Sequence, residues 1–549
     1  MDKPVQRAID NLELHIRHAR NLLKSTEEVK ISQLIESHAN MHSVLHEHAA
    51  AYAIDSSAFI YSLLRLPRCI FDTEEIILGQ SFTVFKNNGF ASVDNWKQVE
   101  AVGRRRKMAF DGKKTLAVYI GSVSDVDDLV TLLTAFQIEW NKLHEALAKQ
   151  KNKDIAKLLS ESDIDRLKTI LGEQYDTLLK KLVGKKMSFV VRLISGSYVE
   201  YMRSTQYWWN HVVDTVEPLK INERPIYFVS SNTHSLINLV TKTAVKQKDA
   251  IIDFLKDEHH ADLLTVWEEI MASKSDATEE FFLNYVAKKY AREHPEFNKL
   301  QEKDLRSLGI AHVRPHHFLD ISVQVLELKH FAKITPSLIV GLDLAKLKQS
   351  QALIVNIDYP LGWSAYQILT EVAQNVDIIR GVYIMGKAAV LTGEIGDVML
   401  PGTVYDLHTK NEYVFNNAIT TIDMKKVYKT GSVFNNQKAL TVKGTFFENQ
   451  QFINYWYKQG YATIEMEAGP YLNAVYECVA YNRYLENQHV SLTNVPFELG
   501  MAHYASDTPN SKAKNLGARN LSYEGVESTY GITQVILQKI IERELSFLN

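Results

Sequence analysis

The amino-acid sequence predicts an α/β protein: a mixed, largely parallel sheet sandwiched by helices, preceded by a mainly helical N-terminal domain. From about residue 221 onward, continuous runs rich in Val and Ile alternate with helical segments, which is typical of a sheet covered on both faces. Before that point, apolar residues recur mostly at helical spacing. Because 549 residues are too many for one ordinary core, we expect two domains, residues 1–220 and 221–549.

The N-terminal domain is expected to consist mainly of packed helices. Apolar residues at helical spacing predict two or three helices between Val5 and Leu64, and further helices over 126–148 and 162–183. The segment TLAVYIG at 115–121 is the one strand candidate of this domain.

The second domain begins with a strand, a polar loop and a helix within RPIYFVSSNTHSLINLVTKTA, where residues 226–229 form the strand. A charged helical insertion is expected near 250–310. Further strands are predicted within SLIVGLD (337–343), ALIVNID (352–358), IIRGVYIMGKAAVL (378–391) and GDVMLPGTVYDL (396–407). Open α/β sheets bind ligands at the carboxyl ends of their strands, so the candidate loops are 230–235, 358–362, 386–389, 444–449 and the segment from Ser506 onward.

Composition excludes several classes of protein. The 62 basic and 65 acidic residues give a formal charge of -3, which argues against a sequence-independent nucleic-acid binder. Cys69 and Cys478 are the only cysteines, so a disulfide framework or a Cys-rich zinc site is not expected. The N-terminus alternates in charge, and no apolar run is long enough to span a bilayer, so we expect no membrane association and a cytoplasmic location.

An ordered set of motifs follows residue 221: VNI at 355–357, MGKAAVL at 385–391, GD at 396–397, IEMEA at 464–468, and SDTP at 506–509 followed by Lys514, Gly517 and YEG at 523–525. On these motifs the second domain resembles the nucleoside phosphorylase and nucleosidase superfamily, and most of all the catalytic domain of AMP nucleosidase. The resemblance implies the nucleoside phosphorylase-like fold and cleavage of the N-glycosidic bond of a purine nucleoside or nucleotide, without a metal or organic cofactor. It also implies a homo-oligomer, with an N-terminal domain linked to regulation or assembly.

The resemblance gives roles to several residues of the last two motifs. Asp507, of the pair Ser506-Asp507, would protonate the departing base, a role suited to a carboxyl group partly withdrawn from water. Glu467 would accept hydrogen bonds from the ribose hydroxyls, with Met466 against the sugar and Glu465 as a second candidate contact. Taken alone, Asp507 could instead be a helix N-cap or Asx-turn residue, and the two glutamates could lie on a solvated strand end.

The purine base is expected to lie against an aromatic ring from GTFFENQQFINYW (444–456). By spacing, Phe452 is the first candidate and Phe447 the second. Buried Phe residues at this spacing are as easily part of a hydrophobic core.

The chain departs from the phosphorolytic members in the groups that hold inorganic phosphate. The loop 230–235 contains no Arg, and Ile384 stands where many phosphorylases place an Arg. Water is therefore expected as the nucleophile. Lys387, Lys514 and Arg519 could hold a phosphate already attached to the substrate, although ordinary surface cations would look the same.

Two alternatives stay open on sequence grounds: a purine nucleoside phosphorylase, and a non-catalytic nucleotide sensor or scaffold with the same fold. The altered 230–235 loop and Ile384 favour the second of these.

Other polar clusters have ordinary interpretations as well as functional ones. His38, His42 and His46 are four residues apart and could bind zinc on a helix, but a polar helix face is the default. The basic segment GRRRKMAFDGKK (103–114) could reach a nucleotide phosphate, an effector or a second subunit, whereas a solvated turn is the more ordinary interpretation. His234 is a candidate base by residue type and a capping residue by position.

Overall fold

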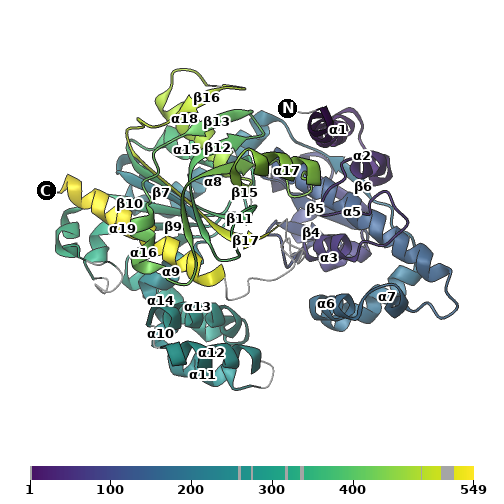
Figure 1. Cartoon of the computed structure of the whole chain (residues 1–549), viewed down its shortest axis with the longest axis horizontal. Helices are drawn as coiled ribbons and strands as arrows, with labels where there is room; N and C mark the ends of the chain where they lie inside the picture. The colour runs from purple at the N-terminus through teal and green to yellow at the C-terminus, as the bar shows by residue number, and fades with distance from the viewer. Residues whose placement is uncertain are drawn as a thin grey trace.

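The computed structural model describes residues 3–257, 261–273, 276–315, 319–333, 339, 341–483, 485–508 and 525–548. It confirms the predicted fold class, a mixed α/β protein with helices on both faces of a large sheet. Figure 1 shows the N-terminal segments, coloured purple to blue, on one side of the molecule, and the strands and helices of the second half on the other.

The first half is built on a six-stranded sheet that the sequence only partly predicts. The strand order is β1 (Val29–Lys30), β6 (Val190–Leu193), β2 (Glu75–Gly79), β5 (Thr115–Tyr119), β4 (Met108–Phe110) and β3 (Lys97–Val99). The prediction locates β5 alone, because strands of two to five residues are too short for a clear periodicity.

Helices nevertheless contain most of the residues of this half that are in regular secondary structure. They are α1 (Lys3–Ser25), α2 (Ile35–Asn40), α3 (Ser56–Leu64), α4 (Phe82–Asn87), α5 (Val123–Ala148), α6 (Glu161–Leu171), α7 (Tyr175–Gly184) and α8 (Tyr198–Thr215). The helix predicted over 162–183 is two helices, because Gly172 adopts a φ of +53°, which ends α6.

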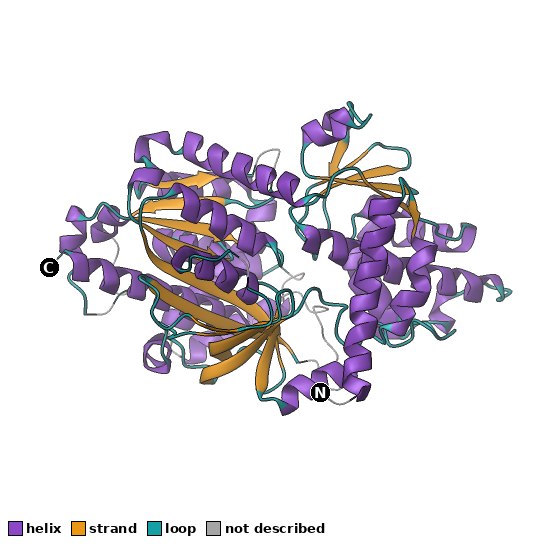
Figure 2. Cartoon of the chain, turned by 90° about the horizontal axis from the view of Figure 1, so that it is seen from above, coloured by secondary structure: helices purple, strands orange, loops and turns teal. Residues whose placement is uncertain are grey.

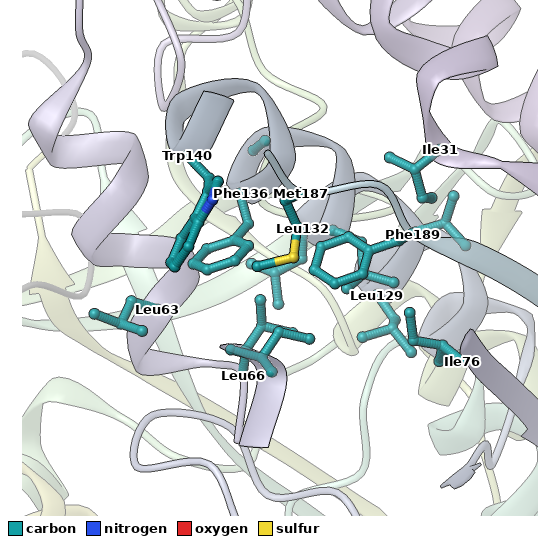
Figure 3. Packing of buried hydrophobic residues seen from close by; sticks show 14 of the residues in the cluster. Ile31, Leu63, Leu66, Ile76, Leu129, Leu132, Phe136, Trp140, Met187 and Phe189 are labelled. Atoms are coloured by element: carbon teal, nitrogen blue, oxygen red, sulfur yellow. The ribbon is translucent and has the colours of Figure 1, made fainter. Parts of the chain in front are cut away.

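The hydrophobic core of the first half forms along α5. Figure 3 shows Leu129, Leu132, Phe136 and Trp140 of this helix packed against residues of the sheet and of α3. The Phe136 ring lies 5.7 Å from that of Trp140 and 6.2 Å from that of Phe189. Both Phe136 and Trp140 are fully buried, so this cluster joins α5 firmly to the sheet.

The second half contains an eleven-stranded mixed sheet. Its order is β16 (His489–Ser491), β13 (Asn411–Val414), β12 (Val398–Asp406), β14 (Val433–Thr441), β15 (Tyr461–Glu465), β11 (Ile379–Val390), β7 (Ile226–Ser231), β10 (Leu353–Asp358), β9 (Val323–Glu327) and β8 (Ile310–Val313), and β17 (Glu498–Asp507) pairs with both β11 and β12. The pairs β10/β7, β7/β11, β11/β17, β12/β14 and β14/β15 are parallel. Since β17 connects β11 to β12, five strands close into a ring (β11, β15, β14, β12, β17).

Helices cover both faces of this sheet, as Figure 2 shows. On one face α15 (Ser364–Asn375) and α18 (Ala468–Val479) pack together and against α8, and on the other α9 (His234–Thr241), α16 (Thr421–Val427) and α19 (Val526–Phe547) pack together. All residues of β7 and β10 are buried, which explains their continuous apolar sequences. A further helix, α17 (Gln450–Lys458), lies against α1 and so connects the two halves.

The helical segment near 250–310 forms a cluster of its own. After α10 (Thr243–Lys246), the helices are α11 (Lys248–Leu255), α12 (Ala261–Ser273), α13 (Asp276–Glu293) and α14 (Pro295–Ser307), with Trp267 and Phe282 in their common core. Figure 1 shows this group projecting from the body of the molecule.

The strand predicted within SLIVGLD is wrong at its described positions. Residues 339 and 341–343 are not in a strand, and the other positions lie outside the described residues. The neighbour of β10 is instead β9, which pairs with it in antiparallel register. An apolar run alone cannot show which segment finds a pairing partner. Within the described part of the chain, no helix combines the length and the apolar character needed to cross a membrane.

Candidate active site

A cavity of about 350 Å³ lies where loops after the strands of the large sheet meet the first half of the chain. The second half contributes Ser230, Lys387, Glu467 and Asp507, and the first half contributes Arg65 and Arg104. The volume lies within the range of small-molecule binding sites. Strands β7, β11 and β17 are parallel neighbours, so their carboxyl ends open toward this cavity together.

The two carboxyl groups on which the sequence interpretation depends, those of Asp507 and Glu467, line this same cavity. Asp507 is the last residue of β17, and Glu467 is the N-cap residue of α18. The Ser506 hydroxyl donates a 2.8 Å hydrogen bond to the Asp507 carboxylate. Met466 also lines the cavity, next to Glu467.

Glu467 is held by the loop that follows β10. The backbone N–H of Gly362 donates a 3.0 Å hydrogen bond to its carboxylate. Burial raises the pKa of Glu467 to about 7, while the Gly362 hydrogen bond and the positive charge of Arg104 oppose the rise. The group therefore changes its charge close to neutral pH.

Glu465 lines the cavity but has a structural role in the first turn of α18. Its carboxyl group accepts hydrogen bonds of 2.6 Å from the backbone N–H groups of Glu467 and Ala468, and another from the Thr441 hydroxyl. Burial, followed by repulsion from Glu467, raises the pKa of Glu465 to about 8. These contacts orient Glu467 and leave Glu465 poorly placed to contact a ligand.

Of the three cations expected to hold a phosphate, the structure describes one. Lys387 lines the cavity, and burial lowers its pKa although the negative charge of Asp507 opposes the change. Lys514 and Arg519 lie outside the described residues. Ile384 also lines the cavity, at the position where the sequence departs from the phosphorylases.

Neither Phe452 nor Phe447, the two residues expected to contact a purine base, lines the cavity. Both are buried in a core shared with Trp456 and with apolar residues of α1. Asn449 caps α17 by accepting a 2.9 Å hydrogen bond from the Phe452 N–H, which directs the apolar face of this helix toward the core.

Glu448 was not among the site residues predicted from the sequence. It lies in the same segment and lines the cavity. It is buried, and its Oε2 atom has no hydrogen-bond partner among the described residues. Burial, with a smaller contribution from the charge of Asp507, raises the pKa of Glu448 to about 8. The sequence could have indicated Glu448 as a site residue, because it is an acidic residue in the loop after β14, at the carboxyl end of a strand.

The basic segment 103–114 is only partly a solvated turn over residues 104–106, because Arg105 is exposed, Arg104 is half-buried and Arg106 is buried. Arg104 and Arg105 line the cavity, whereas Arg106 is buried behind them. Arg104 forms a 2.7 Å ion pair with Asp128, and Arg105 forms an ion pair with Asp358 at the end of β10. Sequence alone could not show this placement, because it depends on how the two halves pack.

Two of the three histidines considered for a metal site, His38 and His46, instead belong to a buried hydrogen-bonded chain. His38 Nε2 lies 2.9 Å from His46 Nδ1, and His46 Nε2 lies 2.7 Å from the Glu139 carboxylate. Only His38 is in a helix, because α2 ends at Asn40 and both His42 and His46 follow it. No group of three or more potential metal ligands occurs among the described residues. His234 begins α9, does not line the cavity, and has its pKa lowered to about 4 by burial.

The fold and the cavity define a mixed α/β protein with a polar, ionisable pocket between its two halves. The chain belongs to a protein family described as a family of unknown function (DUF6909), whose profile matches residues 31–542. The match therefore includes both sheets. No curated protein matches the chain.

Many solved structures are similar to the chain at low levels, and two nucleosidase structures are among them. One is a proposed methylthioadenosine nucleosidase from Weissella paramesenteroides ATCC 33313, with 10% identity, a TM-score of 0.29, and coverage of 42% of this chain and 89% of that chain. The other is AMP nucleosidase from Bacteroides thetaiotaomicron VPI-5482, with 10% identity, a TM-score of 0.29, and coverage of 61% of this chain and 97% of that chain. Likeness at this level supports no inference about function.

Proposed function

We propose that this protein hydrolyses the N-glycosidic bond of a purine nucleotide or nucleoside, with AMP as the leading candidate, to release the free base and the sugar. The observation that supports this proposal is that Asp507 and Glu467, from the ends of two different strands of the large sheet, line one cavity. The motifs IEMEA and SDTP, which suggested these roles, thus supply two acidic groups to a single ligand-sized space.

Asp507 has the role of general acid. Its carboxyl group donates a proton to the departing base nitrogen, which takes the electron pair of the broken C1′–N bond. The oxygen of a water molecule forms the new bond to C1′. Of the water's two protons, one stays on the new hydroxyl group at C1′, and the other returns through solvent to Asp507 and restores its acid form, so that atoms and charges balance over one turnover.

Glu467 has the role of holding the ribose. As a carboxylate it accepts hydrogen bonds from the sugar hydroxyls, and these charge-assisted bonds fix the sugar below the acid. Met466, beside it on the cavity wall, supplies an apolar contact to the sugar.

Glu448 has the role of contacting the base in place of Phe452. With its pKa raised to about 8, its carboxyl group is mostly neutral at pH 7 and can both donate and accept a hydrogen bond. Its Oε2 atom, which has no hydrogen-bond partner among the described residues, is available to a polar ligand atom.

A second candidate function is phosphorolysis, and the arginines favour it. The loop 230–235 and position 384 contain no Arg. The first half of the chain instead supplies positive charge to the cavity through Arg65, Arg104 and Arg105. Added inorganic phosphate distinguishes the two reactions, because only a phosphorylase requires it for release of the base.

The first half is part of the proposed enzyme in either case. The sequence interpretation assigns it to regulation or to assembly of a homo-oligomer, and light scattering on the purified protein would test the latter. The arginines that it adds to the cavity favour a more direct role in ligand binding.

The experiment that tests the function measures free base by chromatography from a panel of purine nucleosides and nucleotides, with and without phosphate. We expect wild type to release adenine from AMP, and Asp507→Asn to be slower by about 100-fold or more, as for loss of a general acid. The variant Asp214→Asn, on the exposed surface of α8, is the matched control and should retain wild-type activity. If wild type releases no base from any compound, the protein is a non-catalytic sensor or scaffold, and the hydrolase proposal is wrong.

A further inference from the structure

The first half of the chain places an arginine loop and the end of a helix at the cavity. Arg65 is the C-cap residue of α3, and Arg104 lies in the loop before β4. The N–H of Gly103 donates a 2.6 Å hydrogen bond to the carbonyl oxygen of Leu64, which ties this loop to the last turn of α3. The two arginines are therefore positioned by one local structure.

Arg65 differs from the neighbouring arginines in its partners. Arg104 and Arg105 each form an ion pair with an aspartate, whereas no carboxylate of the described residues lies within ion-pair distance of Arg65. Its Nη1 donates a 3.1 Å hydrogen bond to the Tyr61 carbonyl oxygen, and its guanidinium carbon lies 3.5 Å from the centre of the Tyr61 ring.

Burial makes the lack of a direct ion pair costly, because the negative charges of Asp128 and Asp507 act on Arg65 only from beyond ion-pair distance. Arg65 is only 9% exposed and lines the cavity. Arg stays protonated at neutral pH, and a buried charge without a partner is strongly destabilising. Stacking on Tyr61 compensates for only part of this cost. The remaining guanidinium donors are thus arranged for an anion that enters the cavity.

The charges of the other cavity walls are compatible with an anion. Lys387 adds a further cation from β11. Glu448 and Glu465 have pKa values raised to about 8, so both are largely uncharged at pH 7. Asp507 and Glu467 are the other two acidic residues that line the cavity.

We infer that Arg65 and Arg104, together with Lys387, form a subsite for a phosphate group, so that the first half of the chain completes the binding site. The planar guanidinium groups suit the bidentate recognition of phosphate oxygens. This inference rests on the proposed function only for the identity of the rest of the ligand. The phosphate group has two sources: the ester phosphate of a nucleotide substrate, or inorganic phosphate that acts as the nucleophile.

The first measurement needs no variant. Calorimetric titration of the wild-type protein with inorganic phosphate should show saturable binding at one site per chain, together with a rise in the unfolding temperature. Absence of both effects at phosphate concentrations of tens of millimolar would overturn the inference.

The second measurement compares Arg65→Met with Arg68→Met, a control in which the exposed arginine bonds only the Ile170 carbonyl oxygen in the described structure. We expect Arg65→Met to weaken phosphate binding by about 10- to 100-fold, as for loss of hydrogen bonds to a charged group, and Arg68→Met to leave it unchanged. If Arg65→Met does not fold, Arg65→Lys and Arg104→Gln replace it. Phosphate affinity equal to wild type in the folded variants contradicts the inference.

The third measurement identifies the source of the phosphate and uses Asp507→Asn to prevent turnover. If the source is the ester phosphate, inorganic phosphate competes with AMP, and AMP binds more tightly than adenosine. If inorganic phosphate is the nucleophile, it binds together with adenosine. Arg65-dependent phosphate binding without any release of base would refute the proposed function and leave the subsite standing. If Arg65→Met releases base with the same KM for AMP and for phosphate as wild type, the subsite is refuted and the proposed function stands.

Discussion

The backbone N–H of Val44 donates a 2.9 Å hydrogen bond to the carbonyl oxygen of Glu448, so the first half of the chain directly holds a cavity loop of the second. The same loop accepts another contact from α3, because the Tyr61 hydroxyl donates a 2.8 Å hydrogen bond to the Thr445 hydroxyl. The position of the Glu448 carboxyl group therefore depends on both halves.

Removal of the Tyr61 hydroxyl tests this dependence. Tyr61→Phe should lower the free energy of unfolding by about 1 kcal/mol, as expected for one partly buried hydrogen bond, and should raise KM more than it changes kcat. Tyr52→Phe is the control, because Tyr52 is 99% exposed. Steady-state kinetics and denaturant unfolding measure the two effects. Identical kinetics for the two variants would show that the contact does not position the loop.

The pH dependence of activity follows from two raised pKa values. Under the proposed function Glu467 must be a carboxylate, so activity should rise with pH through about 7, and Glu448 must be a neutral acid, so activity should fall through about 8. A narrow bell-shaped profile of kcat/KM is expected. Glu448→Gln keeps a neutral polar group, so it should remove the contribution of Glu448 to the alkaline limb and leave the acid limb unchanged. An unchanged alkaline limb in that variant would assign it to another group.

The stability of the ligand-free protein should fall as pH rises from about 6.5 to 8. Glu448, Glu465 and Glu467 ionise in the unfolded chain near the ordinary value of 4.5, whereas in the folded protein they hold their protons up to about pH 7 or 8. Between these limits the three glutamates bind more protons in the folded state than in the unfolded state, so their contribution to the free energy of unfolding decreases with pH. The buried histidines His15, His234 and His503, with pKa values lowered to about 3 to 4, act in the opposite sense below their ordinary pKa of 6.5. Thermal unfolding between pH 6.5 and pH 8 therefore measures the slope of the glutamates. Glu448→Gln should reduce it, whereas Glu217→Gln, on the surface, should not.

The core position of Phe452 can be separated from a ligand-binding role by one substitution. Phe452→Leu should lower the free energy of unfolding by roughly 1–2 kcal/mol, because it leaves a small void in a fully buried site. KM should be unchanged. A KM that rises without loss of stability would restore the stacking role that the sequence suggested.

Comparison of the structure with the sequence-based expectations shows which parts of the molecule were predictable. The strands β7, β10, β11 and β12 were predictable because their buried residues form continuous apolar runs bounded by loops. Asp507 and Glu467 were predictable because each lies in a short motif, and loops at strand ends converge whatever the rest of the chain does.

The remaining features depend on contacts between residues far apart in sequence. Arg65 and Arg104 reach the cavity only because the two halves pack together, and nothing local to them indicates a partner near Asp507. Phe452 was misassigned for the same reason, because its neighbour in the core is α1, more than 400 residues earlier in the chain. Glu448 is different, because its loop was predicted from the sequence as a ligand-binding loop. The residues predicted to contact the ligand from this segment were the aromatic ones and not the acid.

Gly362 offers the most specific test of how the halves are joined at the cavity. Its φ of +52° lies in the left-handed region, and a Cβ atom there would lie 2.5 Å from the Ser124 hydroxyl oxygen, on α5 of the first half. Gly362→Ala therefore forces the loop away from Ser124, and this movement also breaks the hydrogen bond from the Gly362 N–H to Glu467. The variant should lose both stability and kcat/KM.

The matched control is Gly460→Ala, whose φ of +79° carries the same backbone strain but whose Cβ would meet no atom within 4 Å. It should cost about 1–2 kcal/mol of stability and leave kcat/KM unchanged. Since the clash of Gly362→Ala is with the Ser124 side chain, the double variant Gly362→Ala/Ser124→Gly should recover part of the lost kcat/KM. Failure of this rescue, with equal losses in the single and double variants, would show that strain at residue 362, and not contact with α5, displaces Glu467.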